Sequence, residues 1–421
     1  MQTPTMNPPN PSHSTRSLSP LLAARPFLQD GVLHVPVTYM RGGTSTGVVL
    51  WGPHLAPLAD VRDEILRKIM GVPDSGERPG NKQITGLGRG PATSNKVFIV
   101  EPADGTRADF NTTLAQLAAE KSAIDWSVNC GNMSSALPLF VLHHGLVPAG
   151  DPHTNVRLFN TNTQVVTDCR VRTPGGVPVI PDDTEIPGVD GAFPGVELSL
   201  REPVGAKTGQ LLPTGRVRDT FDGVDVSCVD VAVPMVILRA DAVGLRGDES
   251  VASLNANEAL KARLRSLWVQ AGLAMRLQKK GVPMTAQALA TSETVPKVCL
   301  VSRPTQGGHV AVRYFTPQES HASLAVTGGC CLATACLILG TTAHEVARGL
   351  EPLHAQNAER VVAMENPAGI LRARVSGRCA ADGGFVFPWV AYERNAQLYL
   401  DGFFRIHRPS AQAMALCSAQ A

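Results

Sequence analysis

The amino-acid sequence predicts a mixed α+β protein of two similar domains, each a barrel-like sheet wrapped around one central helix. The chain has 421 residues, and a domain averages roughly 150 residues, so two domains are expected. Its 39 glycines and 32 prolines indicate many tight turns, and therefore many short strands. Each half also contains a short and almost wholly apolar helix, which must be buried on every side.

The charge and cysteine content exclude several classes of protein. There are 38 basic and 36 acidic side chains, and the net charge of +2 is too balanced for a dedicated nucleic-acid binder. No apolar run reaches the roughly 18 residues that a membrane span needs. The nine cysteines are an odd number without a C-x-x-C pair or a secretory signal, which favours reduced thiols. We therefore expect a soluble, cytoplasmic protein.

The N-terminal segment differs in composition from the rest of the chain. Residues 1–30 are prolines among Ser, Thr and Asn with little to bury, and this predicts a disordered tail. From Gly31, apolar and polar residues alternate up to Tyr39, which predicts a strand. A glycine-containing turn over 41–47 and an apolar run over 48–51 then complete a hairpin.

The remaining elements follow from periodicity and end signals. A helix is expected over 60–70, where acids come first and bases last, and a long one over 255–278, which Asn257 can cap. The two apolar helices are expected at 132–141 and 330–338, and a long Pro/Gly-rich connection at 173–194. Strands are expected over 96–100, 156–160, 164–171 and 310–315, and from about 370 onward.

These elements divide the chain into two expected domains. The first covers residues 31–200 and the second covers 201–405, and a return of the chain to the first domain near the C-terminus is left open. Residues 406–421 are expected to form a C-terminal tail.

Four segments could carry chemistry, and the first is the turn at 43–47. It matches the G-x-S-x-G nucleophile elbow of serine hydrolases, but the elbow requires a strand that runs into a helix. Here a second strand is expected, which disfavours a hydrolase that uses Ser45. Two alternatives stay open. Either the turn has no chemical role, or the backbone N–H groups and hydroxyls of residues 42–45 (Gly42, Gly43, Thr44 and Ser45), with Arg41 nearby, bind an anionic substrate.

The second segment is the glycine-rich stretch at 85–96. Its spacing fits neither phosphate-binding glycine motif, and it leads into a strand where those motifs lead into a helix. Lys96 begins this strand. A lysine at the mouth of an apolar site loses its proton readily and can act as a base, although a lysine at a strand edge is more often solvated.

The third segment, residues 129–135, places a cysteine at the start of a buried helix. The helix N-terminus would stabilise a thiolate at Cys130. A buried, inert cysteine is the ordinary alternative. However, Asn129, Asn132 and Ser134 would be costly to bury without a purpose, so we favour a functional site. The same helix end could instead hold a substrate carboxylate.

The fourth segment, residues 321–331, is the counterpart of the third in the second half. We expect Thr327 to occupy the place of Cys130, with the second apolar helix following. Two helix N-termini that face each other across a cleft would bind a polyanion without a metal. His321 either binds a carboxylate or caps a turn. No cluster of His, Cys, Asp or Glu has the spacing of metal ligands, so no metal site is expected.

Together these segments resemble the PrpF family, which includes 2-methylaconitate isomerases, aconitate Δ-isomerases and 4-oxalomesaconate tautomerases. The resemblance runs in order from about residue 35 to 405 and rests on residues 40–45, 86–88 with 93–96, 129–132, 212–215, 255–257 and 325–328. It implies a diaminopimelate-epimerase-like fold with the active site between the two domains. It also implies an isomerase without a cofactor and a small di- or tricarboxylate substrate, with a homodimer as the possible assembly.

The resemblance further implies that Lys96 and Cys130 are the catalytic pair. Moving a double bond along a tricarboxylic acid requires a base and an acid, and backbone N–H groups can stabilise the charge that develops. Which of the two groups is the base stays open. The substrate-binding residues that the resemblance implies are Arg41, Gly43, Thr44, Ser45, Thr93, Ser94, Asn129, Gly131, Asn132, Met133, Ser134, His321, Thr327, Gly328 and Gly329.

Two positions depart from the family pattern. The family usually has a lysine in the first turn where this chain has Thr46, which leaves the identity of the substrate open. Diaminopimelate epimerase has a cysteine at each helix start, whereas the second one here is expected to be Thr327. A racemase with two thiols is therefore disfavoured, and a non-catalytic tricarboxylate-binding protein remains an alternative.

Overall fold

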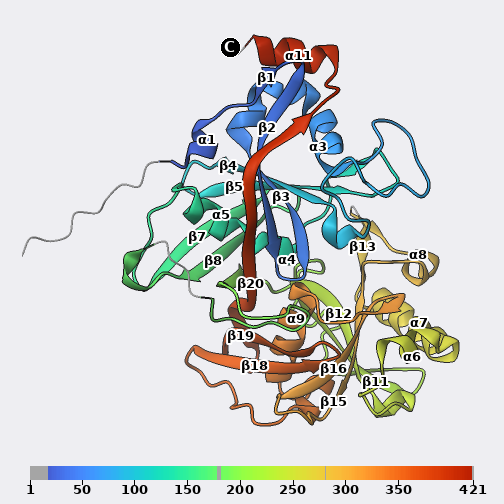
Figure 1. The fold of residues 1–421 in the computed structure, drawn as a ribbon. Helices are drawn as coiled ribbons and strands as arrows, with labels where there is room; N and C mark the ends of the chain where they lie inside the picture. Colours follow the sequence, from blue (N-terminus) through green and yellow to red (C-terminus); the bar gives the residue numbers. More distant parts are fainter. Residues whose placement is uncertain (1–17, 178–181, 280, 420–421) are drawn as a thin grey trace, which may run out of the picture.

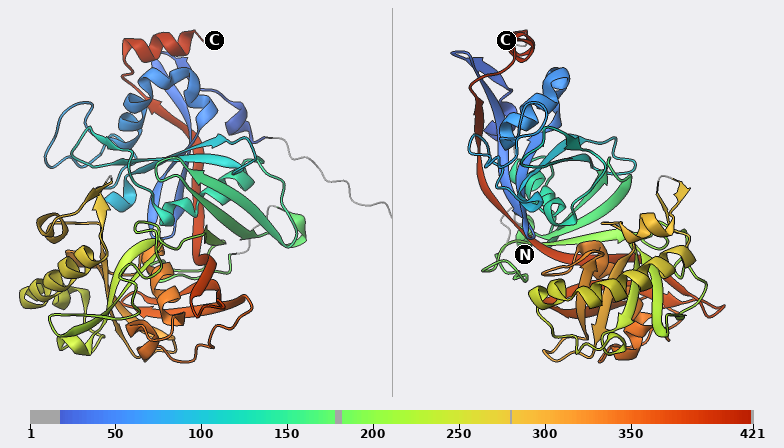
Figure 2. Two further views of the ribbon diagram at one scale, coloured as in Figure 1. Left: turned by 180° about the vertical axis from the view of Figure 1, so that it is seen from behind. Right: turned by 90° about the vertical axis from the view of Figure 1, so that its right-hand side faces the viewer.

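The computed structural model describes residues 18–177, 182–279 and 281–419, which form a mixed α+β fold of two lobes (Figure 1). Hydrogen bonds connect 18 of the strands in these residues into one continuous sheet. The long strand β20 (Phe385–Ile406) runs from one lobe into the other, as both views in Figure 2 show. Within the described residues, no helix is long and apolar enough to cross a membrane.

Eight strands close a barrel in the first lobe, in the order β20, β2, β3, β4, β5, β7, β8 and β9. Most neighbours are antiparallel, but β3 with β4 and β5 with β7 are parallel. The strands other than β20 span Val32–Gly42 (β2), Ser45–Trp51 (β3), Lys96–Pro102 (β4), Phe110–Leu117 (β5), His153–Asn160 (β7), Val165–Arg172 (β8) and Gly195–Arg201 (β9). Inside lie the apolar residues of α4 (Gly131–Ser134) and α5 (Leu137–His143).

The second lobe repeats this order of pairing. The hairpin β11–β12 is followed by a crossover to β15, which is parallel to β12. After that β16 is antiparallel to β15, β18 is parallel to β16, and β19 is antiparallel to β18. Its strands are β11 (Val224–Val231), β12 (Val233–Arg239), β15 (Lys297–Ser302), β16 (Val310–Thr316), β18 (Ala358–Asn366) and β19 (Gly369–Cys379), which pairs with the first part of β20. The apolar helix α9 (Val326–Leu337) packs against these strands, and eleven of its residues are buried.

Helices outside the sheet cover the crossovers. In the first lobe α3 (Arg62–Met70) packs on the outer side of β3 and β4. In the second lobe the single helix expected over 255–278 is two helices, α6 (Val251–Ala256) and α7 (Glu258–Ala274). The chain breaks at Asn257, whose Oδ1 accepts a hydrogen bond from the Leu260 N–H at 3.0 Å and so caps α7, as expected.

The shorter elements complete the fold. They are α2 (Gly52–Leu55), η1 (Ala56–Val61), η2 (Ala92–Ser94), β6 (Ile124–Asp125), η3 (Pro174–Gly176), β10 (Asp219–Phe221), η4 (Asp241–Val243), β13 (Gln278–Lys279), β14 (Val282–Pro283), α8 (Ala286–Ala290), β17 (Glu319–Ser320) and α10 (Thr342–Val346). The connection expected over 173–194 runs between β8 and β9, and its residues 178–181 lie outside the described ones.

Parts of both segments that were expected to be tails form packed elements in the described residues. Residues 1–17 of the N-terminal one lie outside the described ranges. The rest forms α1 (Pro20–Ala23), which buries Leu22, and β1 (Phe27–Gln29), which pairs with β2. At the C-terminus α11 (Ala411–Ser418) buries Ala413 and Cys417 against η1 and β1. A few apolar side chains are enough to dock such short elements. The average composition of a segment does not reveal these few side chains.

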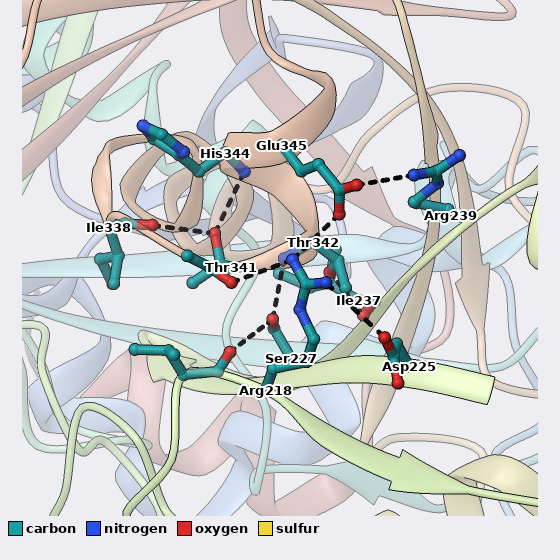
Figure 3. A network of polar contacts seen from close by, with 12 residues as sticks. Arg218, Asp225, Ser227, Ile237, Arg239, Ile338, Thr341, Thr342, His344 and Glu345 are labelled. Atoms are coloured by element: carbon teal, nitrogen blue, oxygen red, sulfur yellow. Dashed lines mark hydrogen bonds and ion pairs between the residues drawn. The ribbon is translucent and has the colours of Figure 1, made fainter. Parts of the chain in front are cut away.

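The far end of α9 is fixed to the sheet by a polar network (Figure 3). The Thr342 N–H donates to Ser227 Oγ at 2.9 Å, and Thr342 Oγ1 donates to the Ile237 carbonyl at 2.8 Å. Glu345 accepts hydrogen bonds from Arg218 at 2.9 Å and Arg239 at 2.7 Å. These contacts tie the segment after α9 to β11 and β12 and so anchor the C-terminal end of the helix.

Candidate active site

Lys96 is the first residue of β4, and its side chain lies on the inner face of the barrel. Side chains alternate along a strand. Phe98 belongs to the core around α5, whereas Val97 and Ile99 pack with α3. Lys96 is only 5% exposed, and its Nζ donates a hydrogen bond to the Ala92 carbonyl in η2. The ammonium group is therefore held at the inner end of the strand.

Cys130 is the N-cap residue of α4, as the sequence predicts. Its carbonyl accepts the first helical hydrogen bond, from the Ser134 N–H at 2.9 Å. Asn129 Oδ1 accepts from the Cys130 N–H at 2.7 Å and from Ser134 Oγ at 3.3 Å. These two polar neighbours thus brace the cap, which leaves the half-buried thiol 3.7 Å from Ser45 Oγ.

Lys96 and Cys130 interact electrostatically. Burial lowers the pKa of Lys96 below its ordinary value, and the negative charge of a Cys130 thiolate opposes that shift. A neutral amine is therefore more accessible at Lys96 than at a solvated lysine. Two groups that can carry a proton thus lie near each other at the ends of β4 and α4.

The hairpin between β2 and β3 packs against the first turn of α4. Gly43 has a φ of 52°, and a Cβ there would lie 2.5 Å from Asn132 Oδ1, so only glycine fits. Asn132 Nδ2 donates to Thr44 Oγ1 at 3.1 Å. Arg41 Nη1 donates to the Gly43 carbonyl at 2.9 Å and to Asn395 Oδ1 at 2.7 Å, which braces the turn from inside.

The first turn of α9 lies against the first turn of α4, at the junction of the lobes (Figure 1). A Cβ on Gly131 would lie 3.1 Å from the Cβ of Val326. The N-cap of α9 is Ala325, whose carbonyl accepts from the Gly329 N–H at 2.8 Å, just as Cys130 accepts from Ser134. The expectation that Thr327 occupies the place of Cys130 is therefore wrong, because Ala325 is the last residue with extended dihedrals.

The other predicted residues of the second half have visible packing roles. His321 Nδ1 accepts from the Ser323 N–H at 2.9 Å, so it caps a turn, and burial lowers the pKa of its ring. Gly328 and Gly329 lie against the rings of Tyr314 and Tyr392, 2.6 and 2.3 Å from where a Cβ would lie. Close ring packing thus explains both glycines.

Comparison with known protein families matches residues 32–407 to the family described as PrpF protein. The chain belongs to the PrpF family. A 4-oxalomesaconate tautomerase of Pseudomonas putida is 35% identical, over 90% of this chain and 98% of that protein. A 3-methylitaconate isomerase of Eubacterium barkeri is 29% identical, over 80% and 90%. The crystal structure of a methylitaconate-delta-isomerase superposes with a TM-score of 0.77 and 27% identity, covering 91% of this chain and 99% of that one.

In this PrpF-family chain, several predicted site residues lie beside the Lys96–Cys130 pair. The side chains of others do not contribute to this site. Thr93 is exposed and Ser94 half-buried in η2, directly before Lys96. Met133 is fully buried in the core, so only its backbone faces the site. Ser45 lies within β3 and contacts a thiol, so the strand-to-helix context of a hydrolase elbow is absent around it.

Sequence reasoning missed two cations of this PrpF protein. Arg394 on β20 donates from Nε to Asn132 Oδ1 at 2.7 Å and from Nη2 to the Leu324 carbonyl at 3.2 Å, and so connects the starts of both helices. No local pattern distinguishes it from the other charges of its strand. Lys297 begins the apolar strand β15, just as Lys96 begins β4, and a comparison of the two halves would have found it.

One group of potential metal ligands occurs among the described residues, namely His143, His144 and Asp401. Both nitrogens of His144 are already hydrogen-bonded, to Ser19 Oγ at 2.6 Å and to Thr38 Oγ1 at 2.9 Å. Asp401 accepts from Thr38 and from His143. Burial lowers the pKa of His144 to about 4, so its ring is neutral. We interpret the group as a closed polar network that fastens α1 to the barrel.

Proposed function

We propose that the chain is a cofactor-independent isomerase that moves the C=C bond of an unsaturated di- or tricarboxylate by proton transfer. The observation that carries this proposal is the pairing of the buried Lys96 with Cys130 at the start of α4. The names of its relatives, an oxalomesaconate tautomerase and a methylitaconate isomerase, support the same reaction class. At about 35% identity they leave the individual substrate open.

We also infer a diaminopimelate-epimerase-like fold for the two lobes. The repeated order of strand pairing and the two buried helices support a diaminopimelate-epimerase-like pair of similar domains, with the site where α4 and α9 meet. The division near residue 200 follows β9, and the second part of β20 then returns to pair with β2.

The reaction needs one proton acceptor and one proton donor. The base removes a proton from a carbon next to a carboxylate, the electron pair shifts along the chain, and the acid returns a proton two carbons away. The double bond moves, and no atom or electron is gained. Burial makes the neutral amine of Lys96 accessible, and the Cys130 thiol at the helix start can supply or accept the other proton.

The surrounding backbone suits the charge that develops during this transfer. The negative charge spreads into a carboxylate, which backbone N–H groups can stabilise. The first turns of α4 and of α9 are in contact, so the free N–H groups of both helix starts lie near one another. The hairpin at Gly43 and Thr44 closes this region on a third side.

The test is proton NMR in D2O with trans-aconitate, 2-methylaconitate, methylitaconate and 4-oxalomesaconate. We expect the wild-type chain to isomerise at least one of them with incorporation of deuterium. Lys96→Met and Cys130→Ala should each lower the rate by about 10²-fold or more, because each removes one of the two proton carriers. Circular dichroism should show that both variants stay folded.

Matched controls are available elsewhere in the chain. Cys379→Ala removes another half-buried thiol, and Lys121→Met removes an exposed lysine that is paired with Glu77, so both should keep full activity. Full activity of Lys96→Met and Cys130→Ala would contradict the proposal. Binding without any deuterium exchange would favour a non-catalytic binding protein instead.

A further inference from the structure

Lys297 occupies the same position in the second lobe as Lys96 in the first. Lys96 pairs with Gly47 across the parallel strands β4 and β3, and Lys297 pairs with Met235 across the parallel strands β15 and β12. On β15, Cys299 belongs to the inner core around α9, whereas Val298 and Leu300 pack with α7. Lys297 is two residues before Cys299, so it lies on the inner face as well.

The two lysines have different neighbours at the helix start. Cys130 caps α4, but its counterpart at the start of α9 is Ala325, whose side chain has no group that can donate or accept a proton. A second base at Lys297 would therefore have no matching acid. The second lobe therefore has a lysine at the position of Lys96 but no thiol at the position of Cys130. We infer that the role of Lys297 is different from that of Lys96.

The charge of Lys297 is unpaired. Within the residues that the structure describes, its ammonium makes no ion pair or hydrogen bond, although the side chain is half-buried. Burial lowers the pKa of Lys297 to about 8, so the group is still mostly protonated at neutral pH. Its charge, together with that of Arg394, adds to the burial that lowers the pKa of His321, so these groups lie near one another.

Two further donors beside Lys297 lack an acceptor. Tyr314 is fully buried, and its hydroxyl has no hydrogen-bond partner in the described part of the chain. Tyr314 pairs with Cys299, which makes it a diagonal neighbour of Lys297 on the inner face. The His321 ring lies edge-on to the Tyr314 ring at 5.9 Å. Because His321 Nδ1 accepts a hydrogen bond, the proton of the neutral ring is assigned to Nε2, which has no acceptor among the described residues.

We propose that Lys297, with His321 beside it, binds a carboxylate of the substrate that lies away from the Lys96–Cys130 pair. A carboxylate is an acceptor with two oxygens and one negative charge, and it complements an unpaired ammonium and a free ring N–H. Arg394 bonds to both Asn132 and the Leu324 carbonyl, so it holds this subsite at a fixed distance from the start of α4. The inference rests on the proposed function and makes Lys297 a determinant of how many carboxylates the substrate carries.

Calorimetric titration with tricarballylate, a saturated tricarboxylate that cannot be isomerised, tests the subsite directly. Lys297→Met keeps the length and apolar stem of the side chain and removes its charge. We expect the dissociation constant to rise about 10-fold or more, since a hydrogen bond to a charged group is lost. Lys297→Arg keeps the charge and should bind within a few fold of the wild type. The surface variant Lys121→Met should bind as the wild type does.

The outcomes separate this inference from the proposed function. Unchanged affinity in a folded Lys297→Met chain, an equal loss in Lys121→Met, or the absence of wild-type binding to tricarballylate would overturn the subsite. None of these results depends on turnover, whereas the proposed function is judged by deuterium incorporation. Should Lys297→Met fold poorly, a loss of affinity in the folded Lys297→Gln variant supports the subsite and wild-type affinity in it overturns the subsite.

Discussion

At the scale of single residues, Lys96 combines a chemical role with a cost in stability. Its pKa is lowered in the folded chain because burial disfavours the ammonium form, whereas the unfolded chain keeps the ordinary value near 10.5. Between these two values the unfolded state binds more protons, so the contribution of Lys96 to stability becomes more favourable as the pH rises. The buried charge is therefore destabilising at neutral pH.

We predict that Lys96→Met is more stable than the wild type at pH 7, because it removes a buried charge, although its isomerisation rate falls by about 10²-fold or more. The gain should shrink as the pH rises toward 10, because the wild-type amine is then neutral. Urea unfolding of both chains at pH 7 and pH 10 measures this difference, with Lys121→Met as the control. A variant that is less stable than the wild type at pH 7 would contradict the interpretation.

Residue types near a helix start were predictable from the sequence, and their exact register was not. Cys130 is the N-cap as predicted. Ser134 is buried as expected, but Asn129 is exposed, and the two side chains bond to each other at the cap. The helix expected over 330–338 begins four residues earlier, at Val326, and its N-cap is Ala325 instead of Thr327. The backbone dihedral angles of Ala325 decide this start, and its side chain gives no signal for it. Arg394 could not be found at all, since its two contacts come from segments far away in sequence.

At the scale of elements, the hydrogen bonds of Thr342 attach the C-terminal end of α9 to the sheet. Thr342 is fully buried and contacts both strands of the β11–β12 hairpin (Figure 3). The hydroxyl of Thr342 and its bond to the Ile237 carbonyl stabilise the turn after α9. This turn was not predicted, because threonine is common in loops and the sequence does not reveal that its side chain is buried.

We predict that Thr342→Val, which keeps the shape and removes the hydroxyl, lowers the free energy of unfolding by about 1–2 kcal/mol. The reason is that the Ile237 carbonyl loses a buried donor. Urea unfolding measures the change. Thr291→Val is the matched control, since the Thr291 hydroxyl bonds to the Gln287 carbonyl on an exposed helix end and should matter little. Equal effects of both variants would contradict the special role of Thr342.

At the scale of the whole molecule, β20 makes the two lobes interdependent. Its first part pairs with β9 and β19, and its second part, from Ala396 to Ile406, pairs with β2. The sequence left open whether the chain returns to its first half, because strand periodicity is local and names no pairing partner. The buried residues Arg394 and Asn395 lie at the change of partner, where they contact the site.

This arrangement makes a clear prediction for two truncations. A chain that lacks residues 396–421 keeps the part of β20 that pairs with β9 but loses the part that pairs with β2, so the first barrel opens and its inner core is exposed to water. A chain that lacks only residues 409–421 loses α11, which buries just Ala413 and Cys417, and keeps every strand of the barrel. We expect the longer truncation to lose cooperative thermal unfolding and the shorter one to keep it at a somewhat lower Tm. Circular dichroism melting curves measure both, and similar cooperative curves for the two chains would show that the barrel does not depend on β20.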